Sequence, residues 1–292
     1  IGGQAPATPP TYTSFVEERP VPDVWTFETS SQRWTGVTPL SDVRGRVNAI
    51  MSTTGALHVV GLDAVEQFRA DLDASAGSVD PSWGTAGRSV ALSPSPALPF
   101  GARAAASDRR AGTIVVATNC TGGACVDRYD RRGSRDSAFG AQGLSQPISG
   151  SVLDVAVQSD GSVLVATSCG GLCISKLTSS GSSDTLFGNG GRMTADATSQ
   201  WSSARIAVAT NGQILVVGGC KQTAISGWCA TKLFANGTAD RQFASSGALR
   251  ITQEALLGVT VNRVRVTTSG EVIAAAACSY KHSNPGYVVP EV

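Results

Sequence analysis

The sequence predicts an all-β protein, a five-bladed β-propeller of four-stranded antiparallel blades whose ring is closed by strands from the two ends of the chain. Three observations lead to this expectation. A motif that ends in an aromatic residue recurs, a glycine turn followed by an apolar run recurs independently, and no segment has the pattern of a convincing amphipathic helix. Two markers that share one period indicate a repeat protein, and four strands per repeat are typical of propeller blades.

The first marker places an aromatic residue three positions after an aspartate. Clear copies begin at Asp80, Asp136, Asp184 and Asp240 and place their aromatics at Trp83, Phe139, Phe187 and Phe243. A fainter copy surrounds Trp34. The spacing corresponds to a period of roughly 50–60 residues. Because a ring of blades needs a large side chain at each seam, we expect all of these aromatics to fill the spaces between neighbouring blades.

The recurring aspartates allow two interpretations. As calcium ligands they would need several oxygens converging on one ion, and the sequence has no loop of the DxDxDG kind. As turn-capping residues they would accept backbone N–H bonds beside the aromatic. We favour the second interpretation and predict no metal site and no cofactor.

The second marker is a turn that ends in glycine and precedes an apolar strand. Its copies end at Gly55, Gly112, Gly161, Gly212 and Gly270. Asp-Gly and Asn-Gly turns suit tight hairpins because glycine accepts a positive φ. Each repeat then continues through a second strand, a short loop, a third strand and a further turn into the aromatic motif, which makes four strands.

The ends of the chain predict how the ring closes. Residues 1–22 are rich in Pro and Thr and are expected to form an arm or linker, and residues 23–292 are expected to form a single propeller domain. The last repeat supplies strands near 261–267, 272–278 and 287–292 and stops before its aromatic motif. The region 25–37 is expected to supply that missing segment, so that no sheet edge stays open.

Cysteine spacing predicts three disulfides. Six of the seven cysteines form close pairs, Cys120 with Cys125, Cys169 with Cys173 and Cys220 with Cys229. Zinc is disfavoured because the separations vary and the only histidines are His58, within a strand, and His282, within a loop. Disulfides imply an oxidising compartment, which we expect to be the extracellular space, the cell surface or the periplasm.

The seventh cysteine, Cys278, has no partner in this pattern. It occupies the position of Cys120, Cys169 and Cys220 in the last repeat, and Val288 stands where its partner is due. Two roles stay open for this thiol. It is either buried as a small hydrophobic side chain, or paired with another chain or with a segment outside this sequence.

The residues resemble a known family, the bacterial delta-sixty repeat. The resemblance is carried by Arg128-Tyr129-Asp130, Gly133-Ser134, Asp136, Phe139-Gly140 and Gly143, together with turns such as Asp160-Gly161 before an apolar run. It covers roughly 47–292 and is clearest over 113–191. The resemblance implies a propeller fold but no agreed activity. The chain departs from the family pattern at Ala244, around 62–76, and in its cysteine pairs.

Composition limits the functions that the chain can have. A net charge of +1 gives no electrostatic case for nucleic acid or an anionic membrane, and no apolar run approaches the length of a membrane helix. We find no catalytic set that could be assigned, which favours a secreted, non-catalytic structural or interaction module that binds a protein partner or a second copy of itself.

The alternative is a carbohydrate-binding or carbohydrate-active propeller that uses its central funnel. Such enzymes use paired carboxylates. The candidates for such a pair are Asp42, Asp63, Asp154, Glu254 and Glu271.

Overall fold

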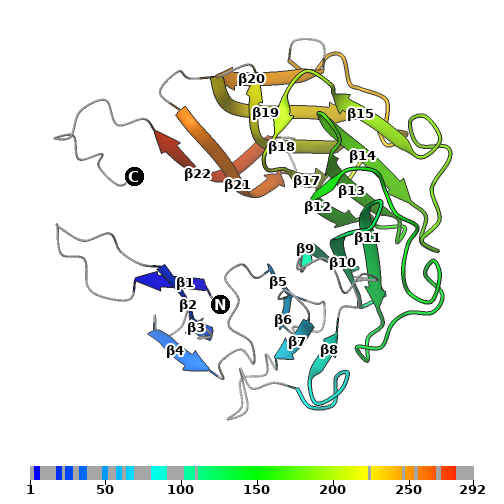
Figure 1. Cartoon of the computed structure of the whole chain (residues 1–292), viewed down its shortest axis with the longest axis vertical. Helices are drawn as coiled ribbons and strands as arrows, with labels where there is room; N and C mark the ends of the chain where they lie inside the picture. The colour runs from blue at the N-terminus through cyan, green and yellow to red at the C-terminus, as the bar shows by residue number, and fades with distance from the viewer. Residues whose placement is uncertain are drawn as a thin grey trace. The chain divides into compact units, whose positions relative to one another are not determined.

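The structure is a computed structural model in which every described element is a β-strand and every strand pairing is antiparallel (Figure 1). It describes Gly3–Pro6, Glu18–Val21, Val24–Glu28, Arg33–Val37, Asn48–Met51, Leu57–Val60, Ala64–Phe68 and residues 80–90, 102–108, 111–222, 225–244, 247–252, 256–267 and 271–280. The chain divides into two compact units, Ile1–Pro147 and Ile148–Val292.

The first unit contains two hairpins and two larger sheets. The hairpins are β1 (Gly3–Pro6) with β2 (Glu18–Val21) and β3 (Val24–Glu28) with β4 (Arg33–Val37). A four-stranded sheet joins β5 (Asn48–Met51), β6 (Leu57–Val60), β7 (Ala64–Phe68) and β8 (Arg88–Val90) in chain order. A three-stranded sheet joins β9 (Ala102–Asp108), β10 (Thr113–Cys120) and β11 (Gly123–Tyr129).

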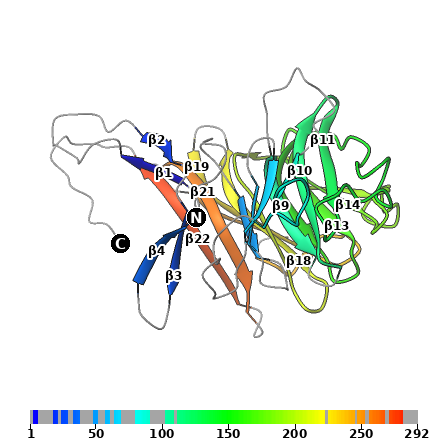
Figure 2. The same ribbon diagram turned by 90° about the horizontal axis from the view of Figure 1, so that it is seen from below.

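The second unit contains three successive sheets. The first joins β12 (Ser151–Val157), β13 (Val163–Ser168), β14 (Leu172–Leu177) and β15 (Arg192–Asp196). In the next, β16 (Gln200–Trp201) and β17 (Arg205–Val208) both pair with β18 (Ile214–Gln222), followed by β19 (Ile225–Leu233) and β20 (Ala248–Thr252). The last is the long hairpin of β21 (Leu256–Val266) and β22 (Val272–Tyr280) (Figure 2).

The core lies along the second strands of these sheets. β10, β13 and β18 are almost wholly buried, because each pairs on both edges and is covered on both faces. Their apolar runs therefore lack the alternation of a strand with one face in water. In the second unit, one cluster joins Leu164 and Ile174 to Ile214 and Val216 of the next sheet, with Phe187 packed among them.

Each motif aspartate fastens its turn to the third strand of the same sheet. The carboxylates of Asp80, Asp136, Asp184 and Asp240 accept the backbone N–H two residues on, as capping residues do. Their second oxygens bond Gln67, Arg128, Lys176 and Lys232, which also accept the aspartate N–H at their carbonyls. This repeated bracket fixes the position of the aromatic that follows.

Two of the aromatics lie against the turn of the following sheet. Trp83 and Phe187 are buried, and the N–H of the glycine after each one bonds a carbonyl in the next sheet, Gly84 to Arg132 and Gly188 to Asn236. A Cβ on Gly237 would stand 2.9 Å from the Phe187 ring. Seams of this kind leave no room for a side chain at that turn.

The other aromatics differ in their surroundings. Phe139 is buried beneath the Arg128 guanidinium, which lies 4.6 Å from the ring centroid. Phe243 is half-buried beside the β21–β22 sheet. Trp34 lies within β4 in register with Phe27, whereas the four other aromatics lie in turns, and its side chain lies outside the described residues. Its predicted place at a seam stays a prediction.

The predicted propeller is only partly visible in these sheets. The all-β class and antiparallel pairing are confirmed. The described sheets have two to five strands, and in the described residues neither β3 nor β4 pairs with β22. Ring closure and uniform four-stranded blades are therefore not confirmed. The segments 261–267 and 272–278 agree with β21 and β22, whereas 287–292 lies outside the described residues.

We expect Gly237→Ala to destabilise the chain more than Gly170→Ala. Both glycines have nearly the same positive φ, +85° and +86°, but only Gly237 faces atoms within 4 Å. Both variants should lose about 1–2 kcal/mol from the left-handed backbone, and Gly237→Ala should lose a further 1–3 kcal/mol or so from overpacking against Phe187. Urea unfolding at neutral pH measures both, and equal losses would contradict the close seam.

Candidate functional site

Three disulfides close the hairpins between the second and third strands. They are Cys120–Cys125, Cys169–Cys173 and Cys220–Cys229, with Cα–Cα distances of 5.8, 6.0 and 5.8 Å. These are the pairs that the spacing predicts. In each hairpin the third-strand cysteine lies opposite the residue two before the second-strand cysteine, namely Thr118, Thr167 and Gly218. Each disulfide therefore joins its two strands diagonally, with an offset of two residues in the strand register. This diagonal staple recurs in three sheets.

The last hairpin, β21–β22, contains the second strand of this pattern, β22, but the neighbours of this strand differ from those of the other second strands. Among the described residues β22 pairs only with β21, whereas β6, β10, β13 and β18 each pair on both edges. Its residues alternate between half-buried and exposed, and Val272 and Ile273 are 44% and 63% exposed. Cys278 lies on this strand, opposite Val259, as a half-buried free thiol. An apolar strand with an open edge is a pairing site.

A polar cluster joins the first strands of the three sheets in the second unit. Arg205 on β17 donates to the carbonyl of Leu153 on β12 and to that of Asn262 on β21. Its guanidinium also lies 3.8 Å from the Asp154 carboxylate. Asp154 accepts the backbone N–H of Ile206 at 2.7 Å, so that the cluster fastens each first strand to the next.

Asp154 titrates abnormally because of this environment. Burial raises the pKa of its carboxyl to about 6, although Arg205, the Ile206 N–H and Arg263 act in the opposite direction. The charged groups that act on Asp154 are arginines rather than a second carboxylate. The cluster is therefore suited to holding strands together and not to the paired-carboxylate chemistry of a glycosidase.

The other carboxylates proposed for a funnel do not join Asp154. Glu271 lies at the exposed turn between β21 and β22, where its backbone bonds Thr267. Asp42, Asp63 and Glu254 lie outside the described residues. The described part of the chain thus brings no pair of these carboxylates together.

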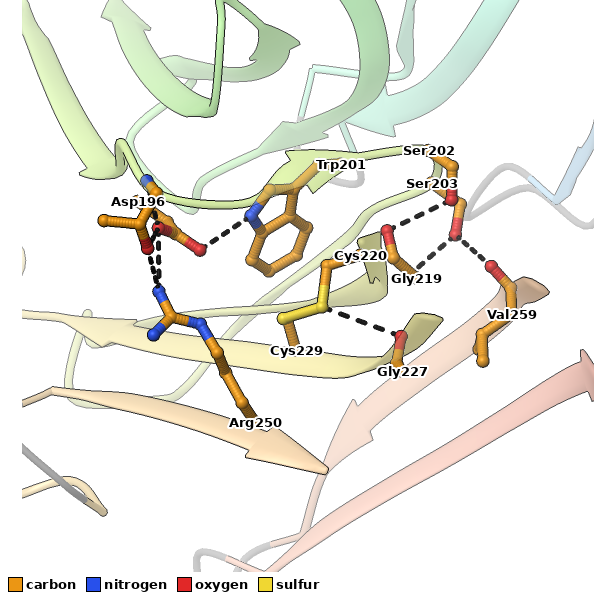
Figure 3. Close-up of a disulfide and its surroundings, with 11 residues drawn as sticks. Asp196, Trp201, Ser202, Ser203, Gly219, Cys220, Gly227, Cys229, Arg250 and Val259 are labelled. Atoms are coloured by element: carbon orange, nitrogen blue, oxygen red, sulfur yellow. Dashed lines mark hydrogen bonds and ion pairs between the residues drawn. A yellow bond between two sulfur atoms is a disulfide. The ribbon is translucent and has the colours of Figure 1, made fainter. Parts of the chain in front are cut away.

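A second polar cluster lies beside the Cys220–Cys229 disulfide (Figure 3). Asp196 accepts hydrogen bonds from the Thr198 N–H, the Trp201 indole N–H and the Arg250 guanidinium. Burial alone would raise the pKa of Asp196, but these hydrogen bonds outweigh it and hold the pKa at about 2. The carboxylate stays charged and connects β15, β16 and β20.

A serine fastens β18 to β21 on the other side of this disulfide (Figure 3). Ser203 Oγ accepts the Gly219 N–H and donates to the carbonyl of Val259. A Cβ on Gly219 would stand 1.8 Å from that carbonyl oxygen, so only glycine permits this approach. The sheet that carries β22 is thus held by a serine hydroxyl and by a close backbone approach at Gly219, neither of which the sequence pattern revealed.

His58 and Asp127 are buried polar residues of the first unit. His58 bonds Gln67 and packs edge-on against Trp83, with ring centroids 5.4 Å apart. Burial lowers the pKa of His58, which favours the neutral ring of a packing residue. Burial likewise raises the pKa of Asp127 to about 6 against the opposing charge of its ion-pair partner Arg135. His282 lies outside the described residues.

Two grooves open at seams of the second unit. The Phe243 groove, of about 340 Å³, lies beside Phe243, Lys232 and Val272. The arginine groove, of about 610 Å³, is lined by Arg192 and Arg241. The sequence pattern did not single out Arg192 or Arg241. Arg241 nevertheless departs from the other copies of the motif, which have Pro81, Ser137 and Thr185 at that position.

No cation site or membrane-spanning helix is found in the part of the chain that the structure describes. No three His, Cys, Asp or Glu side chains there gather as metal ligands do. No described helix is long and apolar enough to cross a membrane.

Comparison with known proteins adds weak likenesses in structure. No protein-family model and no curated protein matches the chain. Among solved structures, a β-propeller domain of Cps50 (Swd1) from Myceliophteria thermophila is 11% identical, with a TM-score of 0.44, covering 83% of this chain and 68% of that one. A nidogen/laminin complex is 13% identical, with a TM-score of 0.45, covering 77% and 73%.

A third solved structure is a protein of unknown function from Bacteroides caccae. It is 12% identical, with a TM-score of 0.36, and the match covers 79% of this chain and 90% of that one. Likenesses at this level do not define a fold by themselves, and the resemblance to the delta-sixty repeat rests on residues alone.

We expect Asp154→Asn to gain stability relative to the native chain as the pH rises. The folded-state pKa of Asp154, about 6, is above the ordinary value of 3.8, so its stabilising contribution is complete below pH 3.8 and lost as the pH passes 6. Between pH 4 and 7 the difference in unfolding free energy should therefore move by about 2–3 kcal/mol in favour of the variant. Urea unfolding of both proteins from pH 4 to 7 measures this difference. A difference in unfolding free energy that does not change with pH would contradict the raised pKa of the buried Asp154 carboxyl.

Asp196→Asn should show the opposite dependence. The pKa of Asp196, about 2, is below the ordinary 3.8, so its contribution is present above pH 3.8 and lost as the pH falls through 2. The variant should be about 2 kcal/mol less stable than the native chain at pH 7. The gap should narrow toward pH 2 in the same unfolding assay. A difference in unfolding free energy that stays constant with pH would show that the variant loses stability through packing around Trp201 and not through charge.

Proposed function

We propose that the chain is a secreted, non-catalytic β-propeller of the delta-sixty kind that acts as an interaction module on the cell surface or in an extracellular assembly. Five successive sheets, from β5–β8 to β21–β22, support five blades, since the second strand recurs in each. The three disulfides support an oxidising compartment.

The observation that carries the proposal is the second edge of β22, which pairs with no strand among the described residues. Its sequence is that of a central strand, yet its side chains are far more exposed than those of β10, β13 and β18. An extended segment of a partner protein would supply the missing third strand, as in strand addition. The ring closed by the chain's own ends is the competing arrangement, because it would cover the same edge.

The diagonal staple specifies the partner strand further. In three hairpins a third-strand cysteine lies opposite the residue two before the second-strand cysteine. For Cys278 that residue is Ala276. A partner strand with a cysteine opposite Ala276 would complete the staple, and we propose that this is the occupant of the edge.

A peptide with the sequence of β19, Ile225–Leu233, tests this proposal because it is a third strand that carries Cys229. In a glutathione redox buffer it should form a mixed disulfide with Cys278 at least about tenfold more readily than a scrambled peptide with the same cysteine. Mass spectrometry of tryptic fragments measures the adduct. Cys278→Ser should form none.

Equal reaction with both peptides would show a merely accessible thiol and would overturn strand recognition. A native chain that does not react, beside a chain truncated after Tyr280 that does, would show that residues 281–292 hold the edge. That outcome would favour the fold closed by its own ends and would also overturn the partner strand.

A further inference from the structure

The arginine groove lies at the seam between the sheets β12–β15 and β16–β20, away from the edge of β22. One side carries Asn189, Arg192, Met193 and Thr194, and the other carries Thr238 and Arg241. Its volume is about 610 Å³. Asn189, Thr194, Thr238 and Arg241 are exposed, so the groove is open to a chain-like ligand rather than closed around a small one.

The positive charge of this groove is not balanced by the described residues. No carboxylate lines it, and neither arginine forms an ion pair there. The Arg192 guanidinium donates to Cys173 Sγ at 2.9 Å, a neutral acceptor. The neighbouring carboxylates are engaged elsewhere, Asp184 with Lys176 at 3.1 Å and Asp240 with Lys232 at 3.2 Å.

The polar groups that remain in the groove are side chains rather than backbone. The N–H groups of Gly188, Asn189 and Thr238 all donate within the chain. A peptide that added main-chain bonds would therefore find these three donors already used. Two guanidinium groups and the Asn189 amide line the groove together with the apolar surfaces of Met193 and Ala239. The hydroxyls of Thr194 and Thr238 already contact Cys173 Sγ and Asn236 Oδ1.

We propose that this groove binds an acidic saccharide. A guanidinium is suited to a carboxylate because it donates two parallel hydrogen bonds. The Asn189 amide suits sugar hydroxyls, and the Thr194 and Thr238 hydroxyl oxygens can still accept hydrogen bonds from them. Met193 suits the apolar face of a ring. This site is independent of the strand-addition edge, so that either proposal can fail alone.

Titration calorimetry with tetragalacturonate tests the site, with neutral maltotetraose and a tetraglutamate peptide as comparison ligands. Tetragalacturonate should bind and maltotetraose should not. Arg241→Gln should weaken binding about tenfold, and Arg192→Gln with Arg241→Gln should abolish it. The matched control is Arg132→Gln, an exposed arginine outside the groove, which should bind as the native chain does.

Thermal unfolding of each variant checks that it is folded, and Arg241→Gln alone keeps the test valid if loss of Arg192 disturbs the contact with Cys173. Absence of tetragalacturonate binding at millimolar concentration would overturn the proposal. Equal binding of the tetraglutamate peptide would replace saccharide recognition by simple charge attraction, and would overturn it too. An unchanged affinity in Arg241→Gln would place the ligand elsewhere.

Discussion

The bracket between each motif aspartate and the third strand is the interaction on which the repeat depends. The aspartate N–H bonds the strand through the backbone, and its carboxylate bonds a long side chain from the same strand residue, as in Asp184 with Lys176. The other carboxylate oxygen caps the turn. Since three contacts fix one short turn, the aromatic that follows can enter the seam without a helix or a longer loop to hold it.

The seams show why the bracket must hold the aromatic in one position. Trp83 and Phe187 face glycine turns of the next sheet, and a side chain at Gly133 or Gly237 would meet their rings at 2.7–2.9 Å. Because the seam is packed this tightly, the position of one sheet fixes the position of the next. The disulfides act at the other end of the hairpins. Their closed loops are short, so by the chain-entropy argument they are local staples rather than the source of the fold.

The polar groups divide into two sets by their partners. Asp154, Asp196 and Ser203 bond groups on neighbouring strands and hold sheets together within the second unit. Arg192 and Arg241 instead lie in a groove without a carboxylate among the described residues. β22 differs from β10, β13 and β18 in a similar way, because among the described residues it pairs with one strand and they pair with two. Among the described residues, the arginine groove without a carboxylate and the unpaired edge of β22 are the features suited to binding.

The sequence by itself determined the β class, the repeat, the capping role of the aspartates and the three disulfides, because each depends on residues close together in the chain. Cys120 and Cys125, for example, are brought together by one hairpin. Only the tertiary structure showed that Asp154 meets Arg205 and that Arg192 and Arg241 line one groove, since these residues come from different sheets. It also showed Trp34 within a strand, whereas the aromatics of the four clear copies of the motif lie in turns. Such pairings depend on how sheets stack, and stacking is set by packing across seams rather than by local residue preferences.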